Sequence, residues 1–282
     1  MHNPARLSIA FALALGLLAA PAHAQQQPAG RVVSMNLCTD QLAMLIAAPG
    51  QLRSVSWLAA DPEASALASD TKGLILNHGL AEEIFLMQPD LVLSGTFTTR
   101  ATVDLLRKLG IRVEEFAPES SLADIRQNII RMGEILRQPA RANEILTTFD
   151  AALAEASASA RKNKTAATYF ANSYTAGSGT LVDSLIAASG LENIAARMGF
   201  SGTARLPLEV LLLAQPDVLI DAEDHPTKPA LAQENFVHPA YLRLAENSAR
   251  VAVPSKYTIC GGPFTVEAIR LLRTATQTGS SK

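Results

Sequence analysis

Short apolar runs alternate with longer amphipathic stretches along most of this chain. Consecutive apolar residues are typical of strands buried on both faces of a parallel sheet, and apolar residues at three- and four-residue spacing predict helices. The predicted strands cover residues 31–35, 54–57, 91–93, 112–116, 166–170, 218–220 and 251–254. The predicted helices cover residues 40–47, 99–109, 122–136, 181–188 and 263–274, with Thr39 as the N-cap of the first. This alternation favours an α/β fold with mainly parallel sheets and right-handed crossovers.

One sequence pattern occurs twice. Residues 82–94 read EEIFLMQPDLVLS, and residues 209–221 read EVLLLAQPDVLID. Each copy has a glutamate seven residues before a proline, then Gln-Pro-Asp around that proline, then an apolar strand. We expect a short helix to end before each proline and the glutamine to be extended, because proline restricts the residue that precedes it. A repeat separated by about half the chain predicts two similar domains.

The segment between the two halves, residues 139–162, is rich in alanine, lacks glycine and has proline only at its start. Leu146, Phe149 and Leu153 lie at helical spacing and form one apolar stripe. We interpret the segment as one rigid helix that ties two lobes together, and an ordinary surface helix of one domain is the alternative. The predicted domains are a signal peptide (1–24), an N-terminal α/β lobe (25–136), a linker helix (137–163) and a C-terminal α/β lobe (164–282).

The first 24 residues have the pattern of a secretion signal. Arg6 supplies a positive charge, residues 7–20 are uncharged and largely apolar, and Ala22-His23-Ala24 matches the small-x-small cleavage site. The apolar run ends at Pro21 and is shorter than the about 20 residues that a spanning helix needs. We therefore expect an exported, soluble chain that begins near Gln25, and an uncleaved membrane anchor is the alternative.

Composition narrows the classes of function. The 282 residues carry 24 Lys and Arg against 26 Asp and Glu, a net charge of −2, and only 5% are aromatic. The chain thus lacks the basic excess and the stacking surface that nucleic-acid binding requires, and we expect no nucleic-acid partner. Two cysteines are too few for a disulfide scaffold or a four-thiolate zinc site. No G-x-S-x-G or phosphate-binding loop is present, so a secreted hydrolase is a distant alternative.

These features together resemble the bacterial periplasmic binding proteins for cobalamin and ferric siderophores. The resemblance rests on the strand at 31–35, on the Glu-x6-Pro-Asp-hydrophobic units that start at Glu82 and Glu209, and on the Gly/Ser-rich turn at 175–181. It covers nearly the whole mature chain. It implies two Rossmann-like lobes with mainly parallel sheets, bridged by a single long α-helix. It also implies a monomeric, non-enzymatic periplasmic protein with no cofactor of its own, which delivers its ligand to the membrane permease dimer of an ABC importer.

The resemblance further implies that Glu82 and Glu209 dock on the permease, each meeting an arginine on one membrane subunit. Two pseudo-symmetric carboxylates suit a symmetric partner, and a carboxylate can bind an arginine through both oxygens. The alternative is that each glutamate is a solvated first-turn residue that interacts favourably with its helix dipole.

We expect the ligand to lie between the lobes, because open α/β sheets bind ligands beyond the carboxyl ends of their strands. The residues predicted there are Asn36, Cys38, Trp57, Asn77, His78, Thr96, Phe97 and Arg100 in the first lobe, and Asn172, Tyr174, Asp221, His225, Lys256, Tyr257 and Cys260 in the second. The aromatic side chains would form flat apolar walls. Arg100 and Lys256 would meet carboxylate, phosphate or amide oxygens of the ligand.

Several interpretations of this site stay open. Cys38 and Cys260 each follow a predicted strand, one in each lobe, and an oxidising compartment would permit a disulfide between them. Two separate thiols, or direct contact of the cysteines with ligand or metal, are the alternatives. The expected cargo is a metal chelate, with a ferric siderophore and a cobalamin-type ligand weighted equally. Haem, with Tyr174, Tyr257 or His78 as its axial ligand, and bare zinc or manganese are the alternatives.

Overall fold

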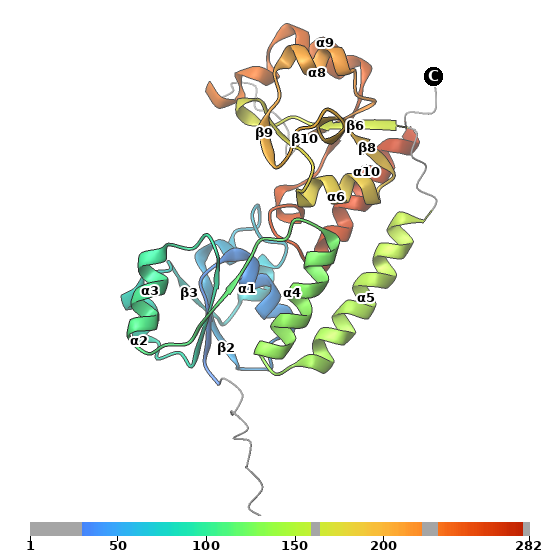
Figure 1. Ribbon diagram of the computed structural model, residues 1–282. Helices are drawn as coiled ribbons and strands as arrows, with labels where there is room; N and C mark the ends of the chain where they lie inside the picture. Colours follow the sequence, from blue (N-terminus) through green and yellow to red (C-terminus); the bar gives the residue numbers. More distant parts are fainter. Residues whose placement is uncertain (1–29, 159–163, 222–230, 279–282) are drawn as a thin grey trace, which may run out of the picture.

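The computed structural model describes residues 30–158, 164–221 and 231–278, and it shows two α/β lobes with one long helix alongside them (Figure 1). The predicted signal peptide, residues 1–24, and the candidate ligand residue His225 lie outside the described residues. Among the helices of these described stretches, none combines the length and apolar character that crossing a bilayer requires.

The N-terminal lobe contains one five-stranded parallel sheet with strand order β3-β2-β1-β4-β5. Its strands are β1 (Val32–Ser34), β2 (Leu52–Ser56), β3 (Ile75–Asn77), β4 (Leu91–Gly95) and β5 (Val113–Phe116). Its helices are α1 (Leu37–Ile46), α2 (Ala81–Leu86), α3 (Arg100–Lys108) and α4 (Leu122–Ile135). The sequence predicted all of these strands except β3.

The C-terminal lobe contains a four-stranded parallel sheet with strand order β11-β10-β6-β8 and a separate antiparallel pair, β7 with β9. The strands are β6 (Lys164–Thr168), β7 (Tyr174–Ala176), β8 (Leu191–Asn193), β9 (Thr203–Arg205), β10 (Val218–Asp221) and β11 (Ala249–Ala252). The helices are α6 (Leu181–Ala188), α7 (Ile194–Arg197), α8 (Leu208–Ala214), α9 (Pro239–Asn247) and α10 (Val266–Thr278). Two mainly parallel sheets confirm the predicted fold class.

Consecutive residues of each central strand belong to different cores. Val32, Leu91 and Leu93 are fully buried in the cluster that α1 and α4 cover. Val33 and Val92 are fully buried in a second cluster, which α2 and α3 cover on the opposite face of the sheet. Side chains alternate between the two faces of a strand, so a sheet covered on both sides needs apolar residues at every position. This is the physical origin of the apolar runs in the sequence.

Helix α5 (Pro139–Ser157) packs against α4 of the N-terminal lobe and α10 of the C-terminal lobe. Its buried residues Ile145 and Phe149 belong to the same apolar cluster as Leu185 of α6 and Ile269 of α10. The cluster therefore runs without a break from one lobe to the other. A shared apolar core makes the two lobes resist separation, because pulling them apart would expose that surface to water.

Helix α5 is shorter than the predicted 139–162, since it ends at Ser157 and Ala158 is already extended. Arg273 of α10 explains this end. Its Nη1 donates to the main-chain carbonyl oxygens of Ala156 and of Glu155, the latter at 3.3 Å. A cationic side chain on the last carbonyl groups of a helix satisfies acceptors that would otherwise lack a partner.

The two copies of the sequence repeat fold alike. In each copy a short helix, α2 or α8, is followed by a glutamine with positive φ, 47° at Gln88 and 44° at Gln215. The prediction that these glutamines are extended is therefore wrong. A left-handed residue ends a helix and turns the chain sharply, and here it directs the chain into the strand that follows the proline.

The aspartate of each repeat connects two neighbouring strands. Asp90 Oδ2 accepts a hydrogen bond from the main-chain N–H of Arg31 at 2.9 Å, just before β1. Asp217 Oδ2 accepts one from Thr165 N in β6 at 2.7 Å. In both lobes the carboxylate thus fixes the start of the first strand beside the start of the repeat strand. Gln-Pro-Asp therefore has a structural role in both halves.

The N-cap of α1 is Asn36, so the prediction of Thr39 is wrong. Asn36 Oδ1 accepts from the N–H groups of Cys38 at 3.0 Å and Thr39 at 3.5 Å, and the helix begins at Leu37. The Thr39 hydroxyl instead lies 2.8 Å from Ser34 Oγ inside the lobe. An asparagine directly after a strand can cap at once, which moves the start of the helix three residues towards the N-terminus.

Asp40 in the first turn of α1 is fully buried, and this burial raises its pKa from 3.8 to about 6. Well below pH 3.8 the carboxyl is protonated in both the folded and the unfolded chain. As the pH rises from about 3 to 7 the unfolded chain loses its proton first, so the free energy of unfolding should fall by up to about 3 kcal/mol. Denaturant titrations between about pH 3 and 7 should show this fall, and Asp40→Asn should flatten it. An equal slope in both proteins would contradict the assignment.

Candidate functional site

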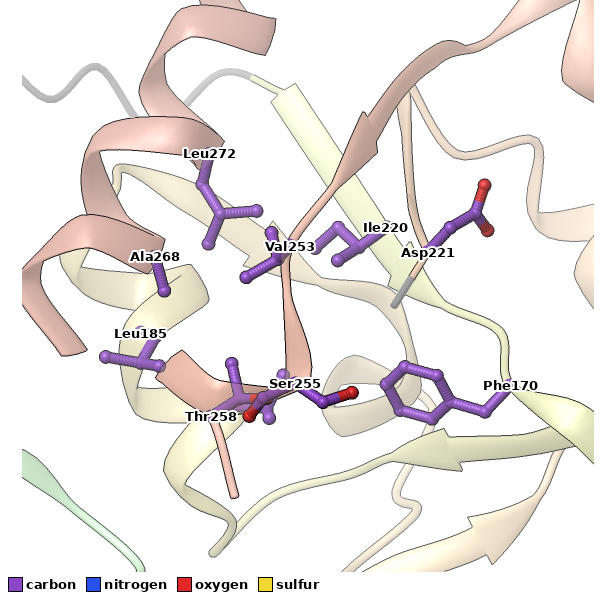
Figure 2. Close-up of a pocket in the computed structure, with 10 residues that line it drawn as sticks. Phe170, Leu185, Ile220, Asp221, Val253, Ser255, Thr258, Ala268 and Leu272 are labelled. Carbon is purple, nitrogen blue, oxygen red and sulfur yellow. The ribbon is translucent and has the colours of Figure 1, made fainter. Parts of the chain in front are cut away.

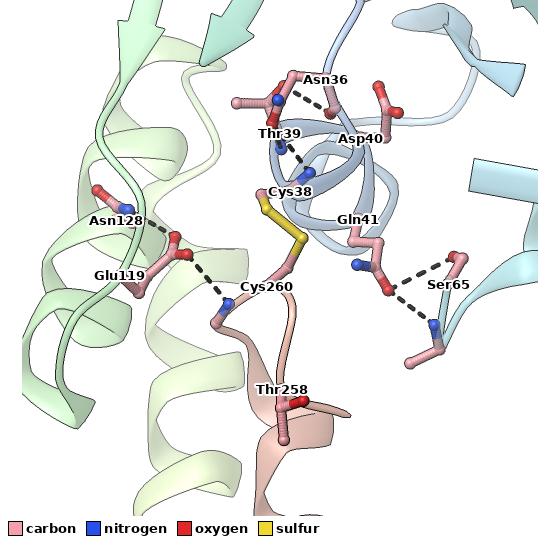
Figure 3. Close-up of a disulfide and its surroundings, with 12 residues drawn as sticks. Asn36, Cys38, Thr39, Asp40, Gln41, Ser65, Glu119, Asn128, Thr258 and Cys260 are labelled. Atoms are coloured by element: carbon pink, nitrogen blue, oxygen red, sulfur yellow. Dashed lines mark hydrogen bonds between the residues drawn. A yellow bond between two sulfur atoms is a disulfide. The ribbon is translucent and has the colours of Figure 1, made fainter. Parts of the chain in front are cut away.

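A disulfide joins the two lobes at the face between them (Figure 3). It links Cys38, in the first turn of α1, to Cys260, which follows β11, with 5.1 Å between their Cα atoms. The sequence left this pairing open. Because Cys38 lies just after β1 and Cys260 lies beyond β11, the bond brings the carboxyl-end edges of the two sheets together. The interlobe face is therefore the edge at which α/β sheets bind ligands.

A close packing contact lies beside the disulfide. Buried Glu119 accepts from Gly261 N at 3.0 Å and from Asn128 Nδ2 at 2.6 Å, as Figure 3 shows. A Cβ atom added at Gly261 would lie 2.6 Å from side-chain atoms of both Glu119 and Ile125. Only glycine fits this approach between the lobes. Sequence reasoning missed Glu119, because no local motif marks a contact between residues so far apart.

A small hollow of about 50 Å³ opens on the N-terminal side of the disulfide. It lies at the carboxyl ends of β1, β4 and β5, and the predicted residues Asn36, Cys38, Thr96 and Phe97 line it together with Glu119. Phe97 is 87% exposed, so its ring stands out from the lobe. An exposed aromatic ring of this kind is ready to cover an apolar surface of a ligand.

A larger pocket of about 250 Å³ lies in the C-terminal lobe (Figure 2). Leu185 of α6 and Leu272 of α10 form part of its apolar wall, and Phe170 and Ser255 lie beyond the carboxyl ends of β6 and β11. Asp221 also lines it, but this buried carboxylate already binds two partners. Its Oδ2 lies 2.8 Å from Arg250 Nη2, and its Oδ1 accepts from the Tyr241 hydroxyl at 3.1 Å.

The predicted aromatic residues are largely accessible. Trp57 and Tyr174 are 50% and 40% exposed, and Tyr257 is half-buried against the core. A cationic side chain lies near each of two of these rings. The Arg205 guanidinium lies 5.7 Å from the centre of the Tyr174 ring, and Lys256 Nζ lies 5.6 Å from the centre of the Tyr257 ring. Sequence reasoning missed Arg205, because the three-residue strand β9 that carries it has no clear periodicity.

Other predicted residues have partners within the protein. Arg100 Nη1 lies 2.5 Å from Glu115 Oε1, so this guanidinium is already paired. His78 is exposed, and its Nδ1 lies 3.5 Å from Glu83 Oε1. Asn77 is fully buried and donates to Ser34 O and Ser54 Oγ, each at 2.8 Å. It holds neighbouring strands together, so its prediction as a ligand contact is wrong. Asn172 has a left-handed backbone in the turn before β7.

The two glutamates of the repeat occupy equivalent places. Glu82 is in the first turn of α2 and Glu209 is in the first turn of α8, and both are exposed. Neither forms an ion pair with another of the described residues. In Figure 1, α2 and α8 lie at the outer edges of their lobes, away from α5. Within the described residues, no group of three His, Cys, Asp or Glu side chains is placed to hold a metal ion.

Residues 32–237 match the family described as periplasmic binding protein. The chain belongs to this family. It is therefore a solute-binding protein of the ABC-importer type and not an enzyme, as the sequence predicted. No protein of curated function matches the sequence directly.

Solved structures of this family share the fold. The apo periplasmic heme-binding protein RhuT from Roseiflexus sp. RS-1 is 24% identical, with a TM-score of 0.70, over 89% of this chain and 99% of that one. The vitamin B12 binding protein BtuF of Vibrio cholerae is 18% identical, with a TM-score of 0.67, over 90% and 99%. An ABC-type Fe3+-hydroxamate transport protein from Saccharomonospora viridis is 18% identical, with a TM-score of 0.64, over 88% and 93%. These identities are low, and the likeness concerns the fold alone.

Proposed function

We propose that this periplasmic binding protein captures a metal chelate, a ferric siderophore or a cobalamin-type ligand, between its lobes and delivers it to the permease dimer of an ABC importer. The observation that carries the proposal is that exposed aromatic rings follow the carboxyl ends of three strands, β2, β4 and β6. Trp57 and Phe97 extend from the N-terminal lobe beyond the ends of β2 and β4, and Tyr174 extends from the C-terminal lobe. Exposing aromatic rings to water is unfavourable in the free protein. A large organic ligand would cover these rings and exclude the water from them.

The charges beside these aromatic rings support a ligand with a few polar groups at its rim. Arg205 and Lys256 each lie against an aromatic ring of the C-terminal lobe, while Arg100 is already paired with Glu115 and Asp104. A ring with an adjacent cation offers a flat apolar surface and one binding point for a carboxylate or amide oxygen. Corrinoids and many siderophore chelates combine these two features. The predicted location is the periplasm, where the importer receives such cargo.

Haem is the second candidate, and one contact favours it. The Tyr174 ring is 40% exposed and has the Arg205 guanidinium beside it. A tyrosine oxygen ligates haem iron in some proteins, and an arginine next to it could pair with a propionate of the same ligand. The haem-binding protein RhuT shares the fold of this chain.

Quenching of the Trp57 fluorescence should identify the ligand class, since Trp57 is the only tryptophan of the chain. We expect saturable quenching by one of cyanocobalamin, haemin and a ferric hydroxamate. Phe97→Ala should weaken that affinity about tenfold, because it removes aromatic contact area. This variant should keep the thermal stability of the wild type, since the ring is 87% exposed. Free N-acetyltryptophanamide controls for light absorption by the ligand, and the absence of saturation with all three ligands would refute the proposal.

A further inference from the structure

The two repeats present a second pair of equivalent side chains besides the glutamates. Leu86 follows Glu82 by four residues in α2, and Leu213 follows Glu209 by four residues in α8. These leucines are 79% and 85% exposed. Residues four apart in a helix lie on the same face, so each helix offers a carboxylate and an apolar side chain side by side. We name each such combination a Glu–Leu pair.

The fold accounts for the other shared positions of the repeat but not for the Glu–Leu pairs. The glutamine ends the helix, and the aspartate binds the first strand of its lobe. The apolar residue between glutamate and leucine, Ile84 or Leu211, is fully buried in its lobe. The leucines, by contrast, contribute little to either core. A single exposed leucine needs no explanation, but the same exposure at equivalent positions of two lobes indicates a shared use.

We infer that each Glu–Leu pair is one docking unit, in which the leucine enters an apolar hollow beside the cation that binds the glutamate. This inference rests on the proposed delivery to an importer and adds an apolar half to the predicted docking contact. The partner is a membrane permease with two equivalent subunits, because two equivalent pairs on one chain match a surface that occurs twice by symmetry.

The chemistry of the pair fits such a partner. The glutamates form no ion pair with the described residues, so their charge is available to an arginine or lysine of the permease. A charged contact fixes register and speeds encounter, whereas affinity comes mainly from apolar side chains buried at the centre of a contact. Glutamate and leucine on one helix face would supply both effects. Helices α2 and α8, which carry the pairs, lie at the outer edges of the two lobes (Figure 1).

Uptake by a deletion strain tests this inference, with each variant expressed in place of the wild-type chain. The probe is radiolabelled cyanocobalamin, haemin or ferric hydroxamate, whichever the purified wild type binds. Leu86→Ser and Leu213→Ser should each reduce the apparent affinity of the importer for the loaded protein about tenfold, and the double variant about a hundredfold. Ligand affinity and thermal stability should stay within error of the wild type, and the methionine variants Leu86→Met and Leu213→Met should retain uptake.

Ile130→Ser on α4 is the matched control, since Ile130 is a 44% exposed apolar residue outside the repeat. Its uptake should equal that of the wild type. Wild-type uptake by the double leucine variant would overturn the inference. If charge reversal of both glutamates still blocked uptake in that case, the predicted glutamate docking would stand. If the wild type itself restored uptake of none of the three probes, both the proposed function and this inference would be refuted.

Discussion

Replacing both Cys38 and Cys260 with serine is expected to lower the free energy of unfolding by roughly 4–5 kcal/mol. The two cysteines are separated by 222 residues in the sequence. A link across so long a segment removes much of the conformational entropy of the unfolded chain, and its loss therefore favours unfolding. Denaturant titration of the oxidised wild type and of the double variant measures the difference.

Reductant provides the control for this experiment. Reduced wild type should unfold at the same denaturant concentration as the double serine variant, whereas the variant itself should not respond to reductant. Glu119, Gly261 and the shared apolar cluster would still hold the lobes together, so we expect a less stable but folded protein. Coincident transitions of oxidised and reduced wild type would contradict the expected contribution of the disulfide.

Charge reversal of both repeat glutamates, Glu82→Lys with Glu209→Lys, is expected to abolish uptake while leaving ligand affinity unchanged. Both carboxylates are exposed and unpaired among the described residues, so their replacement removes no contact within the fold. Each lysine would then lie against the permease cation that the glutamate is proposed to bind, so two positive charges would meet. Like charges held in contact cost several kcal/mol, enough to prevent docking. Uptake measured beside Trp57 quenching separates the two effects.

The matched control reverses two exposed carboxylates outside the repeat, Glu63→Lys with Glu134→Lys. It changes the net charge by the same amount, so it accounts for long-range electrostatic effects on encounter. We expect uptake close to that of the wild type. Equal loss of uptake in both double variants would indicate a general charge effect and would contradict specific docking by Glu82 and Glu209.

Local sequence patterns predicted most strands of the two parallel sheets. The apolar runs at 91–93 and 218–220 predict buried parallel strands, and the structure contains them as β4 and β10. These runs are readable because every side chain of a doubly covered strand must be apolar. Strand β3 was not predicted, although Leu74, Ile75 and Leu76 form a short apolar run in the sequence, and Ile75 and Leu76 are exposed at the sheet edge. So short a run does not by itself determine a strand, because β3 exists only through its pairing with the neighbouring strand β2.

The candidate site could be predicted only in part, for the same reason. The sequence by itself determined the two α/β lobes, the repeat with its two glutamates, and the residues that follow the ends of the strands. Only the tertiary structure decided which of these residues are accessible and not already bound to another part of the protein. It paired Arg100 with Glu115, buried Asn77 among three strands and brought Arg205 onto Tyr174. The periodicity of a segment indicates which of its side chains are buried in the core. Contacts between distant residues depend instead on how the elements pack, and that information is spread over the whole chain.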